Sequence, residues 1–337
     1  MGARKMVSVA IVAYGNAERL LDLVTSVYPQ LDAGDEIVIA VAPRTPGMPS
    51  DMTREVAAEV ARQIPLVRVL PDEGTLGTVG VVGASSRSDS FGTSDASDAS
   101  ERPTPLGALG TSGTPPSGLP PMSLFEQAVR ACKGSFIFLA QPGDVWLPNK
   151  VANTLDAFAM SGSILILHDA QLCDPAGRLV APSLMEMHGS KPGLGKTLTH
   201  NAYLGSCLAF LEPFREFFLP IPAEVVRFDQ WMGLVAEVFG GVALLTKPLI
   251  NKTTGLADAF AVNVATDIAN ITTDAGANRT PSAPPSAPVF GSAPSPRELR
   301  DGQRRLLKAL KRRERELAPV LRQLERRNSQ DGRRDGA

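Results

Sequence analysis

A short apolar run at Phe136–Ala140 is bounded by Gly134 on one side and by a Pro-Gly pair on the other. An apolar segment of this length that ends in turn residues is typical of a strand buried on both faces of a parallel sheet. Asp144 and Trp146 fall just beyond its carboxyl end, which is where open α/β sheets bind their ligands. The stretch therefore predicts a buried central strand and the place of a site, although an ordinary strand–turn–helix connection is the plain alternative.

Similar apolar runs recur along the chain and alternate with segments of helical periodicity. The expected strands lie at 6–13, 36–42, 66–70, 136–140, 164–168 and 241–250, with a hairpin at 171–180. Strands that alternate with helices imply parallel pairing through right-handed crossovers. The predicted fold class is therefore α/β, with a mostly parallel sheet that carries helices on both faces.

Two segments differ from this pattern in composition. Residues 75–121 are dominated by Gly, Ser, Thr, Pro and Asp, and residues 272–296 by Pro, Ser, Ala and Thr. Neither can bury enough apolar surface to offset the entropy of ordering, so we expect a disordered insertion and an extended linker. The predicted organisation is an α/β domain over 1–271 that contains the insertion, then the linker, a helix over 297–327 and a disordered tail over 328–337.

The formal net charge of −1 hides an uneven distribution. Residues 297–327 contain twelve Lys or Arg against five Asp or Glu, so this segment carries +7 and the rest of the chain −8. Leucines form a narrow stripe among these charges, and Pro319 is expected to kink or restart the helix. Three interpretations stay open: an interfacial helix on an anionic membrane, a coiled-coil arm, or a helix packed loosely on its own body. Nucleic-acid binding is not expected, because no aromatic residues interleave the charge.

The three cysteines, Cys132, Cys173 and Cys207, are widely spaced, odd in number and set in apolar surroundings. This usage favours reduced thiols and argues against a disulfide framework or a zinc site. The sequence also has no apolar run long enough to span a bilayer and no secretory pattern in its first ten residues. We therefore expect a cytoplasmic protein, either free or peripheral at the inner face of the plasma membrane through its basic segment.

Asp229 opens a segment in which apolar residues from Trp231 to Val238 share one helical face. A carboxylate in the first turn of a helix is favoured by the helix dipole, so a capping role is the plain interpretation. Since Asn also supplies a capping oxygen, Asp229→Asn is expected to cost little stability.

The order and residues of these stretches resemble family 2 glycosyltransferases of the GT-A fold, particularly their rhamnosyltransferase-like members, over about 7–252. The stretches that carry the resemblance are V-S-V-A-I-V-A-Y-G-N at 7–16, E-I-V-I-A-V at 36–41, G-D-V-W-L-P-N-K at 143–150, H-D-A at 168–170, L-G-S-C-L-A-F at 204–210 and F-D-Q-W at 228–231. The block at 143–150, together with the later D-x-W, is the most specific. The resemblance implies transfer of a sugar, with inversion, from a nucleotide-diphosphate donor to a glycan or lipid-linked acceptor in cell-wall or polysaccharide synthesis.

The resemblance also assigns roles to individual residues. It implies a catalytic base at Asp229, donor contacts from Asp144, Trp146, Asp169 and Lys252, and acceptor contacts from Trp231 and Gly205. Such chemistry needs a carboxylate within hydrogen-bond reach of the acceptor hydroxyl. It also needs positive charge near the leaving diphosphate, usually from a divalent metal.

The chain departs from the family where the family binds its metal. The D-x-D positions are Gln141, Pro142 and Gly143, so both carboxylates are missing, and the late His position is Thr254. Hard cations need oxygen ligands, so we expect no metal and no other cofactor. Two functions follow: a transferase in which Lys252 or another basic residue replaces the metal, or a catalytically silent relative that binds a partner enzyme, a glycan or a membrane surface.

Overall fold

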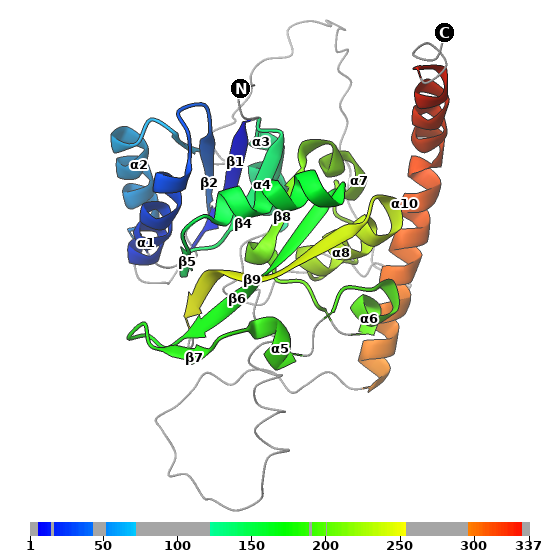
Figure 1. Cartoon of the computed structure of the whole chain (residues 1–337). Coiled ribbons are helices and arrows are strands. Elements are labelled where there is room, and N and C mark those ends of the chain that lie inside the picture. The colour runs from blue at the N-terminus through cyan, green and yellow to red at the C-terminus, as the bar shows by residue number, and fades with distance from the viewer. Residues whose placement is uncertain are drawn as a thin grey trace, which may run out of the picture.

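The computed structural model in Figure 1 describes residues 6–14, 17–42, 52–71, 122–188, 191–199, 201–253 and 296–331. Within them the chain forms a mixed α/β structure in which helices flank a curled sheet, so the predicted α/β fold class is confirmed. The sheet is mixed rather than mostly parallel, because the strands beyond β4 (Phe136–Ala140) include antiparallel pairs. The predicted insertion at 75–121 and nearly all of the predicted linker at 272–296 lie outside the described residues.

The described strands join in one nine-stranded sheet of order β3-β2-β1-β4-β8-β6-β9-β5, with β7 paired to β6. Their bounds are β1 (Val7–Ala13), β2 (Glu36–Val41), β3 (Val67–Val69), β4 (Phe136–Ala140), β5 (Asp144–Trp146), β6 (Leu165–Cys173), β7 (Leu179–Ala181), β8 (Leu208–Leu211) and β9 (Val242–Thr253). Every residue of β1 and β2 is buried, as expected for strands covered on both faces.

The sheet has a parallel half and a mixed half. Strands β3, β2, β1 and β4 are parallel, as the sequence predicts. Beyond them β8 runs antiparallel to both β4 and β6, and β5 runs antiparallel to β9, while β6 and β9 are parallel. The sequence prediction missed β5 because three residues are too few to show a period. It also ended the last strand early, since β9 continues beyond Ile250 to Thr253.

Figure 1 shows α4 in front of the sheet and α3 and α8 behind it. The helix bounds are α1 (Ala17–Val27), α2 (Thr53–Gln63), α3 (Met122–Ala131), α4 (Lys150–Ser161), α5 (Leu184–His188), α6 (Leu194–Thr199), α7 (Arg215–Phe218), α8 (Phe228–Phe239) and α10 (Pro296–Asp331), with single 3₁₀ turns η1 (Tyr28–Gln30), η3 (Gly205–Cys207) and η4 (Glu212–Phe214). None of these described helices combines the length and apolar character needed to cross a membrane.

Helix α10 is one helix that runs through Pro319, so the helix does not end and restart at this proline. It continues to Asp331, four residues into the predicted tail. Its early part packs on α6 and α8, and Leu306 and Leu310 are buried there. Both the membrane interpretation and the coiled-coil interpretation require these two leucines to be free for another surface. In the structure they are buried against the body of the protein. Arg313 fixes the contact by donating to the carbonyl oxygen of Leu219 at 3.0 Å.

Candidate functional site

The turn after β4 leads into β5, which places Asp144 directly opposite Lys252 of β9. Directly opposed residues of an antiparallel pair share one face of the sheet, so their side chains meet. Lys252 Nζ donates to Asp144 Oδ1 at 2.6 Å and to Ser206 Oγ at 3.2 Å. The ion pair is almost fully buried, with 2% of the Asp144 side chain and 7% of the Lys252 side chain exposed. Two predicted donor residues, far apart in sequence, are thus in direct contact.

A second lysine lies beside this pair. Lys150 is the first residue of α4 and is fully buried, and its Nζ donates to the carbonyl oxygen of Ser206 at 3.1 Å. Burial lowers the pKa of Lys150 to about 7, and the nearby Lys252 ammonium acts in the same direction, whereas Asp144 favours the charged form. The ring of Trp146, whose centroid lies 4.1 Å from Nζ, also favours the charged form. Trp146, a predicted donor residue, therefore helps to hold this lysine.

His168 of β6 completes the buried polar cluster. Its Nδ1 donates to the carbonyl oxygen of Asp169 at 2.7 Å, because a carbonyl can only accept. Burial, together with the charges of Lys150 and Lys252, holds the pKa of His168 well below its usual range, so the ring is neutral. Within the described part of the chain, His168 Nε2 and Asp144 Oδ2 are buried without a hydrogen-bond partner. The cluster therefore keeps hydrogen-bonding capacity that its own side chains do not use.

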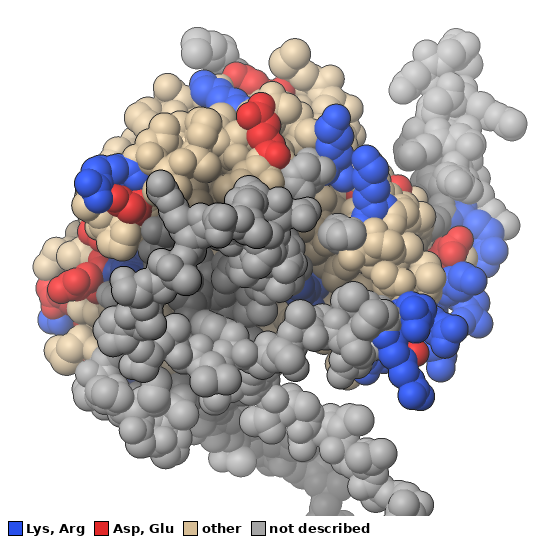
Figure 2. Space-filling model, turned by 90° about the horizontal axis from the view of Figure 1, so that it is seen from below, with Lys and Arg blue, Asp and Glu red and all other residues tan. Residues whose placement is uncertain are grey.

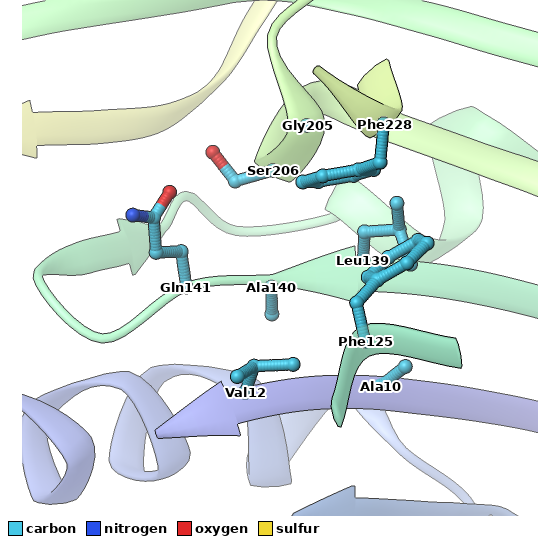
Figure 3. A pocket seen from close by; sticks show the side chains of 9 residues that line it. All are labelled: Ala10, Val12, Phe125, Leu139, Ala140, Gln141, Gly205, Ser206 and Phe228. Atoms are coloured by element: carbon cyan, nitrogen blue, oxygen red, sulfur yellow. The ribbon is translucent and has the colours of Figure 1, made fainter. Parts of the chain in front are cut away.

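A small pocket lies between the carboxyl-terminal parts of β1 and β4 on one side and η3 with the start of α8 on the other, as Figure 3 shows. It is lined by Ala10, Val12, Phe125, Leu139, Ala140, Gln141, Gly205, Ser206 and Phe228. Gln141 and Ser206 form its polar end, and Ser206 connects this end to Lys252. The stacked rings of Phe125 and Phe228, with centroids 4.0 Å apart, close the apolar end. The volume of about 30 Å³ holds roughly one water molecule, so a sugar would enter this pocket only if the rings moved.

Gly205, a predicted acceptor residue, lines this pocket with its backbone. A Cβ atom at this position would come within 2.4 Å of the Phe228 ring, closer than any ordinary contact. Glycine therefore allows Phe228, the residue before Asp229, to close over the pocket. The role of Gly205 in this conformation is to permit a close approach of the helix start.

Asp229, the predicted base, is held by neighbours at the start of α8. Its Oδ1 accepts from Arg227 Nε at 3.1 Å, from Asn201 Nδ2 at 3.0 Å and from the Gln230 backbone N–H at 2.7 Å, and its Oδ2 accepts from Arg227 Nη2 at 2.7 Å. Only 1% of the residue is exposed. Both oxygens are therefore engaged by one guanidinium, and an acceptor could reach this buried carboxylate only if its neighbours moved.

Trp231 and Asp169, the remaining predicted site residues, anchor structural elements. Trp231 is fully buried and donates from Nε1 to the Phe218 carbonyl oxygen at 2.9 Å, which ties α8 to α7. Asp169 accepts from the Met185 backbone N–H at 3.0 Å and from the hydroxyl of Ser183, which ties β6 to α5. Both side chains stabilise the scaffold around the site, and their contacts with ligands stay predictions.

Sequence reasoning assigned no role to Lys150, His168, Ser206 or Arg227. The first three lie inside stretches quoted for the resemblance, but nothing local distinguishes a buried lysine or serine from an exposed one. The role of Arg227 could have been predicted from the sequence. An arginine two residues before a carboxylate at the start of a helix is close enough to bind both carboxylate oxygens.

The chemistry of this cluster does not suit a divalent metal. Among the described residues, no three His, Cys, Asp or Glu side chains are grouped to hold a metal ion. Two lysines and one carboxylate offer ammonium groups where a hard cation would need oxygen ligands. The positive groups of the cluster are these two ammonium groups, and Asp144 already pairs with that of Lys252.

Comparison with known proteins gives structural likenesses only. No family model and no curated protein matches the sequence. Among solved structures, TarS from S. aureus in complex with UDP-GlcNAc is 12% identical, with a TM-score of 0.48, and the match covers 77% of this chain and 61% of that chain. The mannosyltransferase PcManGT from Pyrobaculum calidifontis, in complex with GDP-Man and Mn²⁺, is 13% identical, with a TM-score of 0.46 and coverage of 97% and 80%.

Glucosyl-3-phosphoglycerate synthase from Mycobacterium tuberculosis, in complex with Mn²⁺, UDP and glucosyl-3-phosphoglycerate, is 14% identical, with a TM-score of 0.42 and coverage of 80% and 79%. The chain spans about three fifths of the length of the TarS structure. These likenesses concern the arrangement of helices and strands and do not extend to substrate or mechanism.

Proposed function

We propose that the protein is a GT-A-type glycosyltransferase that binds a nucleotide-diphosphate sugar without a divalent metal and transfers the sugar, with inversion, to a glycan or lipid-linked acceptor. The observation that carries this proposal is the buried ion pair of Lys252 and Asp144 at the carboxyl end of β4. In the family that the sequence resembles, a metal ion supplies the positive charge in this region. Here an ammonium group would supply it.

The chemical need for this charge comes from the leaving group. As the acceptor oxygen forms its bond to the anomeric carbon, the bond from that carbon to the diphosphate breaks and negative charge develops on the diphosphate. A cation fixed in a buried site stabilises this charge strongly, because little water screens it and no reorganisation is needed. Asp144 and Ser206 fix Lys252 in place, and Lys150 adds a second positive charge whenever it is protonated.

The acceptor hydroxyl must lose a proton during transfer. We assign this proton to Asp229, as the resemblance implies. Its carboxylate would have to exchange a hydrogen bond from Arg227 for one from the acceptor. The proposed reaction therefore includes a small rearrangement at the start of α8, and the stacked rings of Phe125 and Phe228 lie beside it.

Calorimetry with uridine, guanosine and deoxythymidine diphosphate sugars, with and without EDTA, tests the proposal. We expect one donor class to bind with an affinity that changes less than about tenfold on chelation, which is 1.4 kcal/mol. A bound donor at about 100 times its dissociation constant should also stabilise the fold by about 2.7 kcal/mol. A larger loss on chelation would show that a metal ion takes part, and no binding to any donor would refute the proposal.

A second function is favoured by the environment of Asp229. Its two oxygens receive four hydrogen bonds and the residue is buried, which is an arrangement that stabilises a helix start rather than one that awaits a substrate. A silent relative would bind a donor or a partner without transferring sugar. Release of nucleoside diphosphate in the presence of donor and acceptor separates the two functions, since only the transferase produces it.

A further inference from the structure

The packing of α10 fixes which side of this helix meets the protein. Leu306, Ala309, Leu310 and Arg313 are all buried, and their spacing places them on one side of a helix with 3.6 residues per turn. Arg312 pins an edge of the contact through its ion pair with Glu224 at 2.8 Å. Between Leu306 and Arg313 the apolar side of α10 is therefore occupied by the body of the protein.

The opposite side of α10 is basic. Its outer basic face consists of Arg297, Arg300, Arg304, Lys308, Lys311 and Arg315, all of which are exposed. From Arg297 to Arg315 this face extends over about 27 Å, at 1.5 Å per residue. The helical spacing brings one acidic residue, Asp301, to its edge, where it lies 3.7 Å from Arg304. The exposed acids Glu314 and Glu316 fall on the flanks, and Glu316 faces Arg312 and Arg313.

The body of the protein extends this charge. Helix α10 packs against α6, where Lys196 is exposed, and Lys191 is exposed just before α6 begins. Figure 2 shows Lys and Arg side chains gathered at the right-hand edge of the molecule, the side on which α10 runs in Figure 1. The surface therefore combines a straight row of positive charges with neighbouring positive charges from the body.

We propose that the outer basic face docks the protein on an anionic lipid bilayer by charge, without inserting the helix. Basic residues near an anionic surface each strengthen binding, and the attraction falls off within a Debye length. Insertion of the part of α10 that carries this face would need Leu306 and Leu310, which are buried against the body. This inference goes beyond the proposed transfer reaction and does not rest on it.

A bilayer fits this surface better than a nucleic acid does. Single strands bind through aromatic side chains that stack on bases, and the outer basic face contains none. A flat anionic membrane, in contrast, can meet a straight row of exposed charges on a docked helix.

Sedimentation with lipid vesicles tests the proposal on the full-length protein. The vesicles contain phosphatidylcholine alone or phosphatidylcholine with roughly one-third phosphatidylserine. The test variant is Arg304→Gln/Lys308→Gln/Lys311→Gln/Arg315→Gln. The control is Arg62→Gln/Arg130→Gln/Arg178→Gln/Lys247→Gln, which removes the same charge from exposed sites elsewhere on the body. Circular dichroism verifies that both variants keep their helical content.

We expect the wild type and the control to sediment with anionic vesicles at low salt, and the test variant to partition at least about tenfold less. Raising the salt to about 0.5 M should release the wild type. Equal sedimentation of the test variant and the wild type would overturn the proposal, and so would equal binding to neutral vesicles, which would indicate insertion. Tighter binding to duplex DNA than to anionic vesicles at equal phosphate concentration would assign the surface to nucleic acid instead.

Discussion

Two buried carboxylates, Asp144 and Asp229, lie at the two ends of the candidate site, and each is 1% exposed and paired with a cation. Asp144 meets Lys252 across two strands, at a separation of 108 positions in sequence, and its Oδ2 has no partner among the described residues. Asp229 meets Arg227 two residues away, and both of its oxygens are engaged.

The two ion pairs therefore differ in hydrogen bonding. One oxygen of Asp144 accepts no hydrogen bond, whereas each oxygen of Asp229 accepts at least one. A buried carboxylate oxygen without a hydrogen bond costs stability, and the group that could pair with it is a hydrogen-bond donor such as a hydroxyl. At Asp229 the same residue type completes the first turn of α8, which is a structural use of the charge. As folded here, Asp144 can accept a further hydrogen bond, whereas Asp229 is already held by its neighbours at the start of α8.

Replacement of Lys252 by Met should have the largest effect. It leaves the Asp144 carboxylate buried without its cation, which typically costs about 3–5 kcal/mol, and donor binding should be lost with it. Urea unfolding and donor calorimetry measure the two effects. The control is Lys247→Met on the same strand, because Lys247 is exposed and should change stability by less than about 0.5 kcal/mol.

A double variant tests whether the loss of stability in Lys252→Met comes from the unpaired carboxylate. Asp144→Asn/Lys252→Met removes the charge that Lys252→Met leaves unpaired, so the double variant should be more stable than the single one. If the double variant loses more stability than the single variant, the ion pair is not the source of the effect. In that case the comparison between the two carboxylates fails.

Replacement of Asp229 by Asn should have an intermediate effect on stability. From the sequence alone little loss is expected, because Asn also caps a helix. The structure raises this expectation to about 1–3 kcal/mol, since Arg227 would lose the carboxylate that binds two of its nitrogens. If Asp229 is the base, transfer should also fall by roughly 100-fold to 10,000-fold.

Arg227→Gln is the matched variant for this prediction. It breaks the same ion pair and should cost similar stability, but it keeps the carboxylate. A transferase should therefore lose much more activity with Asp229→Asn than with Arg227→Gln. Equal losses would assign Asp229 a structural role in an active transferase, whereas a wild type that transfers no sugar would favour the silent relative.

Local patterns account for most of the fold that the sequence predicted. The apolar runs of β1, β2 and β4 and the periodic apolar positions of α3 and α8 are properties of neighbouring residues, so they are visible in one sequence. Strand β5 has three residues, and the antiparallel pairing of β8 between β4 and β6 depends on contacts between distant segments. Neither leaves a local pattern.

In the candidate site, too, contacts between distant residues could not be predicted from local sequence patterns. Asp144 and Lys252 were both predicted at the donor, but their contact depends on how β5 pairs with β9. Lys150 was missed as a site residue because its burial at the start of α4, beside Trp146, comes from packing. Asp229 was placed at a helix start correctly, whereas its bidentate contact with Arg227 depends on side-chain geometry that residue types alone do not determine.

Replacement of Lys150 by Met should have the smallest effect on stability. The variant tests whether Lys150 is charged in the folded protein, beside Asp144 and Lys252. The pKa of Lys150 is about 7 in the folded protein, against 10.5 for the ordinary side chain. Between these values the unfolded chain binds a proton that the folded protein does not. The free energy of unfolding therefore rises with pH, and this contribution is complete above the unfolded pKa and is lost as the pH falls through about 7.

The Met variant lacks this titration, so unfolding in urea should show the wild type gaining stability relative to Lys150→Met from pH 7 to about 8.5. The gain should be at most about 1.4 kcal/mol per pH unit. The window stays below the ordinary pKa of the thiols of Cys132 and Cys207, which burial raises to about 12 and which titrate in the unfolded chain. Parallel curves would mean that the Trp146 ring and Asp144 keep Lys150 protonated, and the donor end would then carry two permanent positive charges against one carboxylate.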